Sequence, residues 1–486
     1  MNNFVSNIKS QVIPLTVIDT QGSFSNIPFV FFYENKTGSD SFMQSETLRN
    51  SFFMTMQQVP MFAGRIKTEG RGRVSIFVDK DNINMPDYRE SSSDVHFDDL
   101  KAAGYSWSSW PQGVNTAGPM TEAGEDGEIK LINVHVIRLK NNSGVMIYVS
   151  MVHYAVDGPA HMEVVLRWCQ NFRLAEEGRS ANISDLPPFV TDRSLIHSSL
   201  SSERAPVDEE TEKTFTGFSL IAEWLAWISP KLRGRIISTI VDGNSKETHI
   251  FHISAASFKR LRDTVSEHIP DGFKISDNDL VLALATKTMV QAQQVVEDRA
   301  QGILKRIQST IFSQDSSKIL PLAVIFEVRE HLGLSEKQYA GNVLIPKIVL
   351  ADLAELKTQT SAESLARAVV SYEPTTRTMS PAYIASHVEM VTSRPSSFTR
   401  PISRFVGHKT AMTFVYDVMP NMYEADFGHG RPEWVSPIQP FRANAVLLLT
   451  HKDPTDGIDV FMTAYPDTMK VILKNEFWMD VANVIY

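Results

Sequence analysis

The turn after one apolar run is the feature around which the rest of the chain is arranged. Residues 145–152 are mostly apolar, which predicts a buried strand, and His153, Asp157 and Gly158 follow it closely. After Pro159 apolar residues recur at helical spacing, and either Asp157 or Gly158 can cap the helix that this spacing predicts. A histidine between a buried strand and a helix N-terminus is a typical position for chemistry in α/β proteins.

The remainder of the N-terminal half divides into strands, one helix and a long polar segment. Residues 45–61 carry apolar residues at helical spacing and predict a helix that ends before Pro60. Residues 81–128 are polar, aromatic and rich in Gly, Ser and Asp, which predicts mainly surface loops. Strands are predicted at residues 12–18, 27–33, 74–78 and 130–139, with a hairpin turn at 70–72.

The C-terminal half has the same character. Residues 182–212 are rich in Ser, Pro and acidic residues, which is typical of a connection between domains. Residues 218–228 predict a short packing helix, because the segment lacks the basic face of a membrane-surface helix. From Thr248 onward strands and helices alternate, so this half is also predicted to be α/β. Its predicted strands are 250–253, 321–326, 342–350, 411–418 and 443–449, and its predicted helices are 254–265 and 276–300.

Length and charge limit the kinds of protein that fit. The 486 residues are too many for one ordinary core, and we assign residues 1–200 and 248–486 to two domains joined by residues 201–247. The net charge of -9 argues against nucleic acid as a general partner. No apolar run reaches the length of a membrane span, and no charged leader precedes an apolar run. We therefore expect a monomeric cytoplasmic protein without a membrane span.

Cysteine and histidine patterns bear on metal binding. The single cysteine, Cys169, lies on the apolar face of a predicted helix, so we interpret it as a core residue. One cysteine excludes an intrachain disulfide and a Cys-based zinc site, and His161 belongs to no His-Glu-x-x-His motif. His135 alternates with apolar residues and is interpreted as a strand-face residue. We therefore expect no metal and no permanently bound cofactor.

The residues after the buried strand allow acid–base chemistry. An ordinary imidazole is mostly neutral at cellular pH and can accept a proton. Asp157 could orient His153, as in a nucleophile triad, or it could face away and hold the turn through backbone amides or an arginine. No Gly-x-Ser-x-Gly elbow or reactive cysteine accompanies the pair. The pattern therefore favours direct deprotonation of an acceptor by His153, followed by attack of that acceptor on an activated substrate.

A second motif appears about 270 residues later, as Asp426-Phe427-Gly428-His429-Gly430. His-x-x-x-Asp-Gly followed by Asp-Phe-Gly-Trp-Gly resembles the paired signature of the BAHD-type acyl-CoA-dependent acyltransferases. Within that family, a fungal trichothecene O-acetyltransferase-like member is one candidate. Shorter segments resemble the family in the same order along the chain, at residues 15–19 with 31–33, 60–65, 326–329 and 341–343.

The resemblance implies two similarly folded, chloramphenicol-acetyltransferase-like α/β domains with mixed sheets and a solvent channel between them. His153 resembles the general base that takes a proton from an alcohol or amine acceptor, which then attacks the thioester of an acyl-CoA co-substrate. Asp157 resembles a structural aspartate that pairs with an arginine, for which Arg329 is our candidate, and Gly158 leaves room beside the turn. The residues that resemble a structural loop remote from the chemistry are Asp426, Phe427, Gly428 and Gly430.

Some positions depart from the family pattern. His429 replaces a tryptophan, which is expected to weaken the packing of its loop but to spare the base. Tyr416 and Asp417 replace a Ser-Trp pair, so substrate contacts there are not transferred. Thr410 and Thr413 are candidate oxyanion donors by resemblance only, and they fit equally well as strand residues. Candidates for binding the CoA phosphates are Ser254, Lys259 and Ser276.

Two other functions remain open at this point. A condensation domain of a peptide assembly line resembles this motif and uses carrier-bound donors, but such domains usually double the histidine, whereas Val152 precedes His153 here. A catalytically silent relative would bind a metabolite or partner, and the intact His153, Asp157 and Gly158 argue against it. The sequence identifies neither the acyl chain nor the acceptor.

Overall fold

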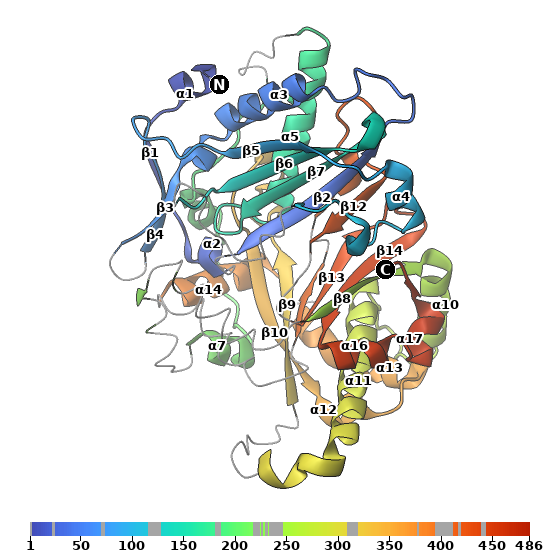
Figure 1. Cartoon of the computed structure of the whole chain (residues 1–486). Coiled ribbons are helices and arrows are strands. Elements are labelled where there is room, and N and C mark those ends of the chain that lie inside the picture. Colours follow the sequence, from blue (N-terminus) through green and yellow to red (C-terminus); the bar gives the residue numbers. More distant parts are fainter. Residues whose placement is uncertain are drawn as a thin grey trace.

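Two large mixed sheets form the framework of the protein (Figure 1). One has five strands in the order β12-β2-β7-β6-β5, the other has seven in the order β10-β9-β11-β13-β14-β8-β15, and a small third sheet has the order β1-β4-β3. The computed structural model describes residues 2–21, 25–69, 73–114, 128–179, 186–216, 224, 227–228, 232, 246–308, 319–376, 379–393, 412–416, 419–438 and 444–486.

The five-stranded sheet carries the turn with His153. β2 (Asn26–Glu34) and β7 (Gly144–Val152) pair antiparallel along their whole length, and β7 is buried at every position. β6 (Ile132–Arg138) pairs with β7 and runs parallel to β5 (Asp87–Ser92). Helices α3 (Ser45–Gln58) and α5 (Gly158–Glu176) pack together over one face, as Figure 1 shows.

The sheet edge is completed from the other half of the chain. β12 (Trp434–Pro437) pairs antiparallel with β2, although the paired residues are 402–408 positions apart in the sequence. The two sheets are therefore linked by a strand that crosses between them. The domain boundaries at residues 200 and 248 stay a prediction.

The seven-stranded sheet is covered by helices on one face. In it, β9 and β10 are antiparallel, whereas β11 runs parallel to both β9 and β13. An apolar core joins this sheet to α10, α11, α13, α16 and α17. Its elements are β8 (Glu247–Ser254), α10 (Ala255–Ser266), α11 (Asp277–Gln308), β9 (Ile319–Glu327), β10 (Leu344–Asp352), α12 (Leu353–Lys357), α13 (Ala362–Thr376), α14 (Pro381–Thr392), β11 (Met412–Val415), β13 (Ala445–Thr450), β14 (Gly457–Ala464), α16 (Pro466–Ile472), α17 (Glu476–Val481) and β15 (Asn483–Val484).

One prediction in the N-terminal half is wrong, and a second is incomplete. Residues 12–18 do not form one strand, because β1 (Gln11–Pro14) ends at the proline and α2 (Val17–Gln21) begins soon after. Thr16 and Asp19 stabilise that helix start, since the Asp19 carboxylate accepts from the Thr16 backbone N–H at 2.8 Å. Residues 81–128 are not only loops: they contain β5, which is a polar edge strand, and the short helix α4 (Phe97–Ala102).

Other differences concern boundaries. The hairpin strands are β3 (Arg65–Glu69) and β4 (Arg73–Val78), and the predicted turn at 70–72 lies outside the described residues. The connection at 182–212 contains α6 (Ser194–Ser198) and the start of α7 (Glu209–Thr216), and most of the helix predicted at 218–228 lies outside the described residues. Within the described part of the chain, no helix combines the length and apolar character needed to cross a bilayer. A short helix, α1 (Asn2–Asn7), lies at the N-terminus.

A buried histidine makes stability depend on pH. His387 on α14 lies against the rings of Phe215 and Tyr383, and burial lowers its pKa to about 3, with Asp208 raising it and Lys347 lowering it. The unfolded chain takes up this proton near pH 6.5, whereas the folded chain does not. The contribution of the neutral His387 to the free energy of unfolding is therefore fully present above about pH 6.5. It is lost as the pH falls toward 3.

We expect His387→Leu to flatten this dependence. Between pH 6 and pH 4.5, the wild-type free energy of unfolding should fall by about 1.4 kcal/mol per pH unit more steeply than that of the variant. Urea titrations at several pH values measure the two slopes. His197→Leu, at an exposed position on α6, should keep the wild-type slope, and equal slopes for wild type and His387→Leu would show this assignment to be wrong.

Candidate active site

His153 is the first residue beyond β7, in a tight turn that leads into α5. Its backbone N–H donates to Ser25 O at 2.8 Å, and Ala155 N–H donates to Val152 O at 2.9 Å. The neighbouring turn residues are buried, whereas the His153 side chain is only half-buried. The buried strand therefore fixes the backbone of a histidine whose ring can still be reached.

Asn342 determines which nitrogen of the His153 ring can accept a proton. The Asn342 amide nitrogen donates to His153 O at 2.7 Å and lies 3.5 Å from Asp19 Oδ1, so the amide oxygen faces the ring. That oxygen lies 3.0 Å from His153 Nδ1, which must then carry the hydrogen. The Nε2 atom consequently holds the lone pair needed by a general base.

The Asp157 carboxylate makes hydrogen bonds that hold the turn after His153. Its Oδ1 accepts from Ala160 N at 3.1 Å and from Arg329 Nη2 at 2.6 Å, and its Oδ2 accepts from Val343 N at 2.9 Å. The side chain is fully buried and caps α5. Of the two roles that the sequence left open, these contacts favour the structural one, and Gly158 begins the capped helix.

Arg329 connects this turn to the segment that carries Asn342. Besides Asp157, it contacts Gly341 O at 2.7 Å and Glu327 Oε1 at 2.9 Å. Burial disfavours its charge, but Asp157 and Glu327 together raise the pKa of the guanidinium. Burial in turn raises the pKa of Glu327. The two halves of the chain are thus joined beside His153 by a buried ion pair.

A second buried ion pair, absent from the sequence-based set, lies behind Asn342. Asp19 Oδ1 accepts from the Asn342 backbone N–H at 3.1 Å and lies 3.3 Å from Arg193 Nε. Arg193 also donates to Ala155 O at 2.9 Å and to Ala340 O. Residues 15–19 and 341–343 both resemble family segments, but nothing in their local pattern indicates that Asp19 and Asn342 meet.

The Asp426 loop lies at the opposite end of α5. Asp426 Oδ1 accepts from Gly428 N at 2.7 Å and Gly430 N at 3.0 Å, and both glycines have a positive φ. Arg173, near the end of α5, donates to Asp426 O. Fifteen residues of helix separate Arg173 from the start of α5, about 22 Å, so this loop is remote from His153.

Phe427 anchors that loop in the core. Its ring is buried and lies edge-on to Tyr33, Trp168 and Phe172, with centroid distances of 5.6, 5.0 and 5.4 Å. His429, which replaces the family tryptophan, packs edge-on to Phe42 at 5.1 Å and remains partly exposed.

The candidate CoA residues have local structural contacts. Ser254 caps α10 by accepting from Ser257 N at 3.2 Å, and Ser276 accepts from Asp279 N at 3.1 Å at the start of α11. Lys259 is exposed and pairs with Asp263, one turn along α10. A role in binding CoA stays a prediction for all three.

The structure describes one of the two candidate oxyanion donors, Thr413, and one of the two residues that replace the Ser-Trp pair, Tyr416. Thr413 lies in β11, where its N–H donates to Asn444 O at 3.1 Å. Tyr416 packs edge-on to Phe414 at 5.0 Å, and burial raises its pKa. Thr410 and Asp417 lie outside the described residues.

The remaining titratable candidates do not compete with His153. His161 is fully buried on α5, and burial, followed by the charge of His153, lowers its pKa to about 3. Burial also lowers the pKa of His135, which contacts Ser91 at 2.8 Å. Burial raises the pKa of the Cys169 thiol, as expected for a core residue rather than a nucleophile.

Comparisons with known proteins agree with this arrangement. The family model described as the Transferase family matches residues 5–218 and 304–478. This match covers most of the sequence, and the chain belongs to that family, the BAHD-type acyltransferases. The two-domain α/β fold with mixed sheets is confirmed, whereas the solvent channel between the domains stays a prediction.

Solved structures with the same fold have low sequence identity. The chain is similar to F. graminearum TRI101 complexed with coenzyme A and T-2 mycotoxin, with 15% identity over 98% of this chain and 100% of that chain and a TM-score of 0.67. Vinorine synthase has 15% identity over 96% of this chain and 97% of that chain, with a TM-score of 0.60. The first condensation domain of the calcium-dependent antibiotic synthetase has 14% identity over 96% of this chain and 94% of that chain, with a TM-score of 0.53. No curated protein matched the sequence significantly.

Proposed function

We propose that this protein transfers an acyl group from an acyl-CoA thioester to a hydroxyl group of a small-molecule acceptor, with His153 as the general base. The observation that carries this proposal is the contact of 3.0 Å between His153 Nδ1 and Asn342 Oδ1. That contact supports a hydrogen on Nδ1, which would leave Nε2 able to accept a proton from the acceptor.

The proposed reaction is a direct transfer. His153 Nε2 takes the proton of the acceptor hydroxyl as its oxygen attacks the thioester carbonyl carbon. The resulting tetrahedral intermediate collapses by breaking the carbon–sulfur bond, and the proton held on Nε2 passes to the departing CoA sulfur. General base catalysis of this kind contributes about 10²- to 10⁴-fold to the rate. The reaction needs no nucleophile from the protein.

The surroundings of His153 support this role electrostatically. The charge that develops on the imidazolium faces the Asn342 carbonyl, and the Asp19 carboxylate lies directly behind the amide nitrogen of Asn342. Arg193 neutralises the resting charge of Asp19. Asn342 and Asp19 are therefore positioning residues that act through His153, and neither is assigned a contact with substrate.

The family and its structural relatives support the choice of donor. TRI101 was crystallised with coenzyme A and with T-2 mycotoxin, and also with coenzyme A and deoxynivalenol. By extension we assign acyl-CoA as the co-substrate and a small hydroxylated molecule as the acceptor, with an amine as the alternative. The condensation-domain likeness keeps a carrier-bound donor as the second candidate.

A donor and acceptor screen tests the proposal. The purified protein is incubated with acetyl-CoA or longer acyl-CoAs and with a panel of alcohols and amines, while free thiol and acylated product are measured. We expect CoA release that depends on the acceptor and yields one ester for each CoA. Consumption of carrier-bound acyl groups alone, with every acyl-CoA left intact, would contradict the proposed donor.

A further inference from the structure

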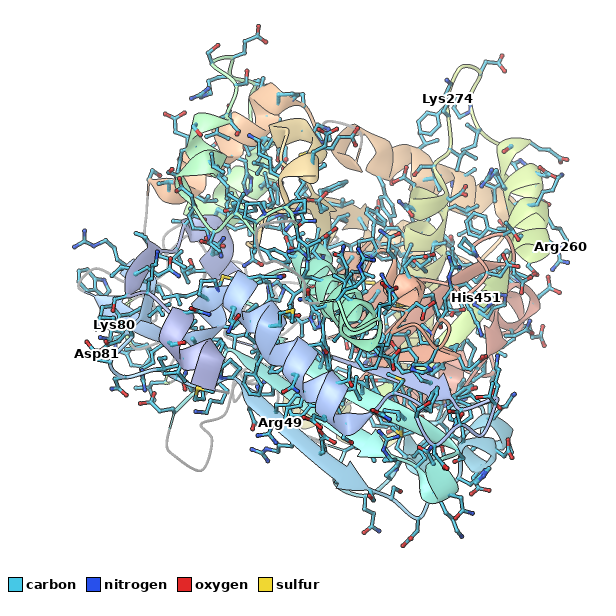
Figure 2. The ribbon with its side chains drawn as sticks, turned by 90° about the horizontal axis from the view of Figure 1, so that it is seen from above. Arg49, Lys80, Asp81, Arg260, Lys274 and His451 are labelled. Carbon is cyan, nitrogen blue, oxygen red and sulfur yellow. The ribbon has the colours of Figure 1, made fainter. Side chains whose placement is uncertain are left out.

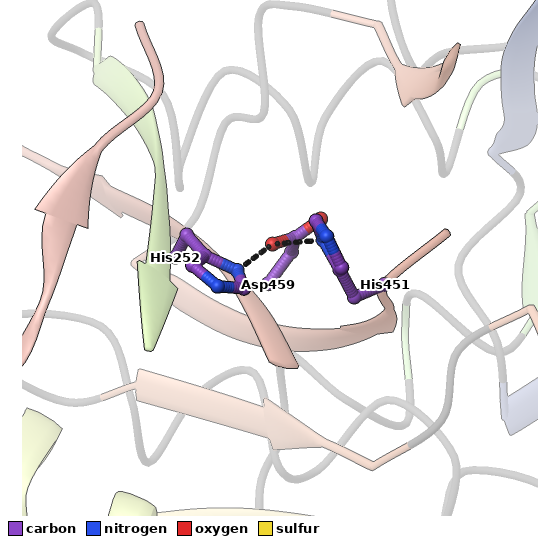
Figure 3. Close-up of side chains that lie close together, drawn as sticks. All are labelled: His252, His451 and Asp459. Atoms are coloured by element: carbon purple, nitrogen blue, oxygen red, sulfur yellow. Dashed lines mark hydrogen bonds and ion pairs between the residues drawn. The ribbon is translucent and has the colours of Figure 1, made fainter. Parts of the chain in front are cut away.

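Three potential metal ligands, two on neighbouring strands and one just beyond the end of a third, meet at the seven-stranded sheet (Figure 3). His252 on β8 and Asp459 on β14 are direct cross-strand partners, and His451 follows the end of β13. Asp459 Oδ1 lies 2.8 Å from His252 Nδ1 and 3.1 Å from His451 Nδ1. The two imidazole rings are 4.4 Å apart. The buried Asp459 carboxylate therefore faces the Nδ1 atoms of both His252 and His451.

A fourth side chain lies on the other side of both rings. The Nε2 atoms of His252 and His451 are each 3.8 Å from Asp456 Oδ2. If each neutral ring carried its hydrogen on Nδ1 to bond Asp459, both Nε2 lone pairs would face the Asp456 carboxylate, acceptor against acceptor. If both rings were protonated, two imidazolium ions would lie against each other. A cation shared between the rings and Asp459 avoids both conflicts.

We propose that His252, His451 and Asp459 bind a divalent zinc-like cation. The metal would replace the two Nδ1 hydrogens and be held by both Nδ1 atoms and the Asp459 carboxylate, with a fourth position left for water. Each ring would then carry its hydrogen on Nε2 and direct it toward Asp456, which orients histidine ligands as second-sphere carboxylates do.

The ligand types and distances fit zinc better than harder ions. Imidazole nitrogen is a good ligand for Zn²⁺, whereas Mg²⁺ and Ca²⁺ prefer oxygen. Ligand atoms about 2.1 Å from a tetrahedral zinc lie about 3.4 Å apart, so the present separations of 2.8 and 3.1 Å need to open by only a few tenths of an ångström.

The position of the cluster indicates a structural role. Leu449 and Phe461 lie two residues from His451 and Asp459 on the same strand face, and both belong to the apolar core that also includes the buried residues of β2 and β7. Lys452 also stabilises the turn between β13 and β14. Its Nζ lies 2.5 Å from Oε2 of Glu433, the residue just before β12. A cation would fix this turn to β8 where the two sheets approach each other.

The site is open enough for a metal to enter. Asp456 is largely exposed, while both histidines are partly accessible and Asp459 is buried. Figure 2 shows His451 on the same side of the molecule as Arg260, away from Lys80 and Asp81 of the first half. The expectation of no metal rested on the single cysteine and on the absence of a short histidine motif, and neither observation applies to ligands at positions 252, 451 and 459.

Zinc binding by the full-length protein tests the proposal. After removal of metals with a chelator and exchange into chelator-free buffer, titration calorimetry with ZnCl₂ should show one ion per chain with a Kd below about 10 μM. Saturating Zn²⁺ should raise Tm, and Mg²⁺ at the same concentration should not. A wild-type protein that binds no Zn²⁺ at millimolar concentration overturns the proposal.

Matched variants locate the ion. His451→Ala and Asp459→Asn should weaken Zn²⁺ binding by at least about 10-fold and remove the shift in Tm, whereas His249→Ala, on the same strand as His252 but outside the cluster, should retain both. Unchanged affinity in His451→Ala would place the ion elsewhere and overturn the assignment. If Asp459→Asn fails to fold, His451→Ala decides alone. His153→Ala should bind Zn²⁺ as the wild type does, so the result is independent of the proposed acyl transfer.

Discussion

His153→Ala is expected to lower the rate of acyl transfer by about 10²- to 10⁴-fold while leaving the protein folded. The variant removes the Nε2 lone pair that takes the acceptor proton, but it keeps the strand, the turn and the capped helix, which are held by Ser25, Asp157 and Arg329. Initial rates at saturating acyl-CoA and acceptor measure the loss. Circular dichroism and Tm establish that the variant is folded.

Two companion variants separate a base from a structural histidine. His197→Ala, at an exposed position, should keep wild-type rates. Asn342→Ala should lower kcat by about 10-fold with little change in the KM for acyl-CoA, and it should alter the pH profile of kcat, because it removes the group that holds the Nδ1 hydrogen. Near wild-type turnover in folded His153→Ala would exclude the general-base role.

Arg329→Met is expected to destabilise the protein by about 3–5 kcal/mol. The substitution leaves Asp157 fully buried without its ion-pair partner, and it also removes contacts to Glu327 and Gly341. Removing one member of a buried pair costs more than the pair contributes, because the remaining charge has lost its solvation and its partner. Denaturant titration of the full-length chain measures the change in the free energy of unfolding.

A double substitution tests the physical reason for that loss. Adding Asp157→Asn to Arg329→Met should recover part of the stability, since the fully buried Asp157 position then no longer carries an uncompensated charge. Arg431→Met removes an exposed pair with Glu424 and should change stability by less than about 1 kcal/mol. If Arg329→Met were as mild as Arg431→Met, the buried pair would not be what holds the turn.

The local parts of the site could be predicted from the sequence because short-range rules govern them. An eight-residue apolar run specified β7, and Asp157 followed by Gly158 and Pro159 specified the start of α5. The family resemblance supplied Arg329 as the partner of Asp157, which the structure places at 2.6 Å. No pattern within either segment could have shown that contact, since 172 residues separate the two.

The parts that could not be predicted depend on tertiary contacts. Asn342 reaches His153 across 189 residues of sequence, and Asp19 reaches Asn342 across 323. The His252 and Asp459 pair exists only because β8 and β14 are neighbours in one sheet. β5 was missed for a similar reason, because a polar edge strand carries little apolar pattern of its own and depends on pairing with β6.

The most direct test of the central claim is a rapid-quench single turnover with acetyl-CoA and an acceptor identified by the screen. If His153 deprotonates the acceptor for direct attack, ester and CoA will form together, the intact mass of the protein will stay unchanged, and folded His153→Ala will form neither product on the same timescale. An acetylated protein that forms before the acceptor is added, or a full turnover in His153→Ala, would contradict the account.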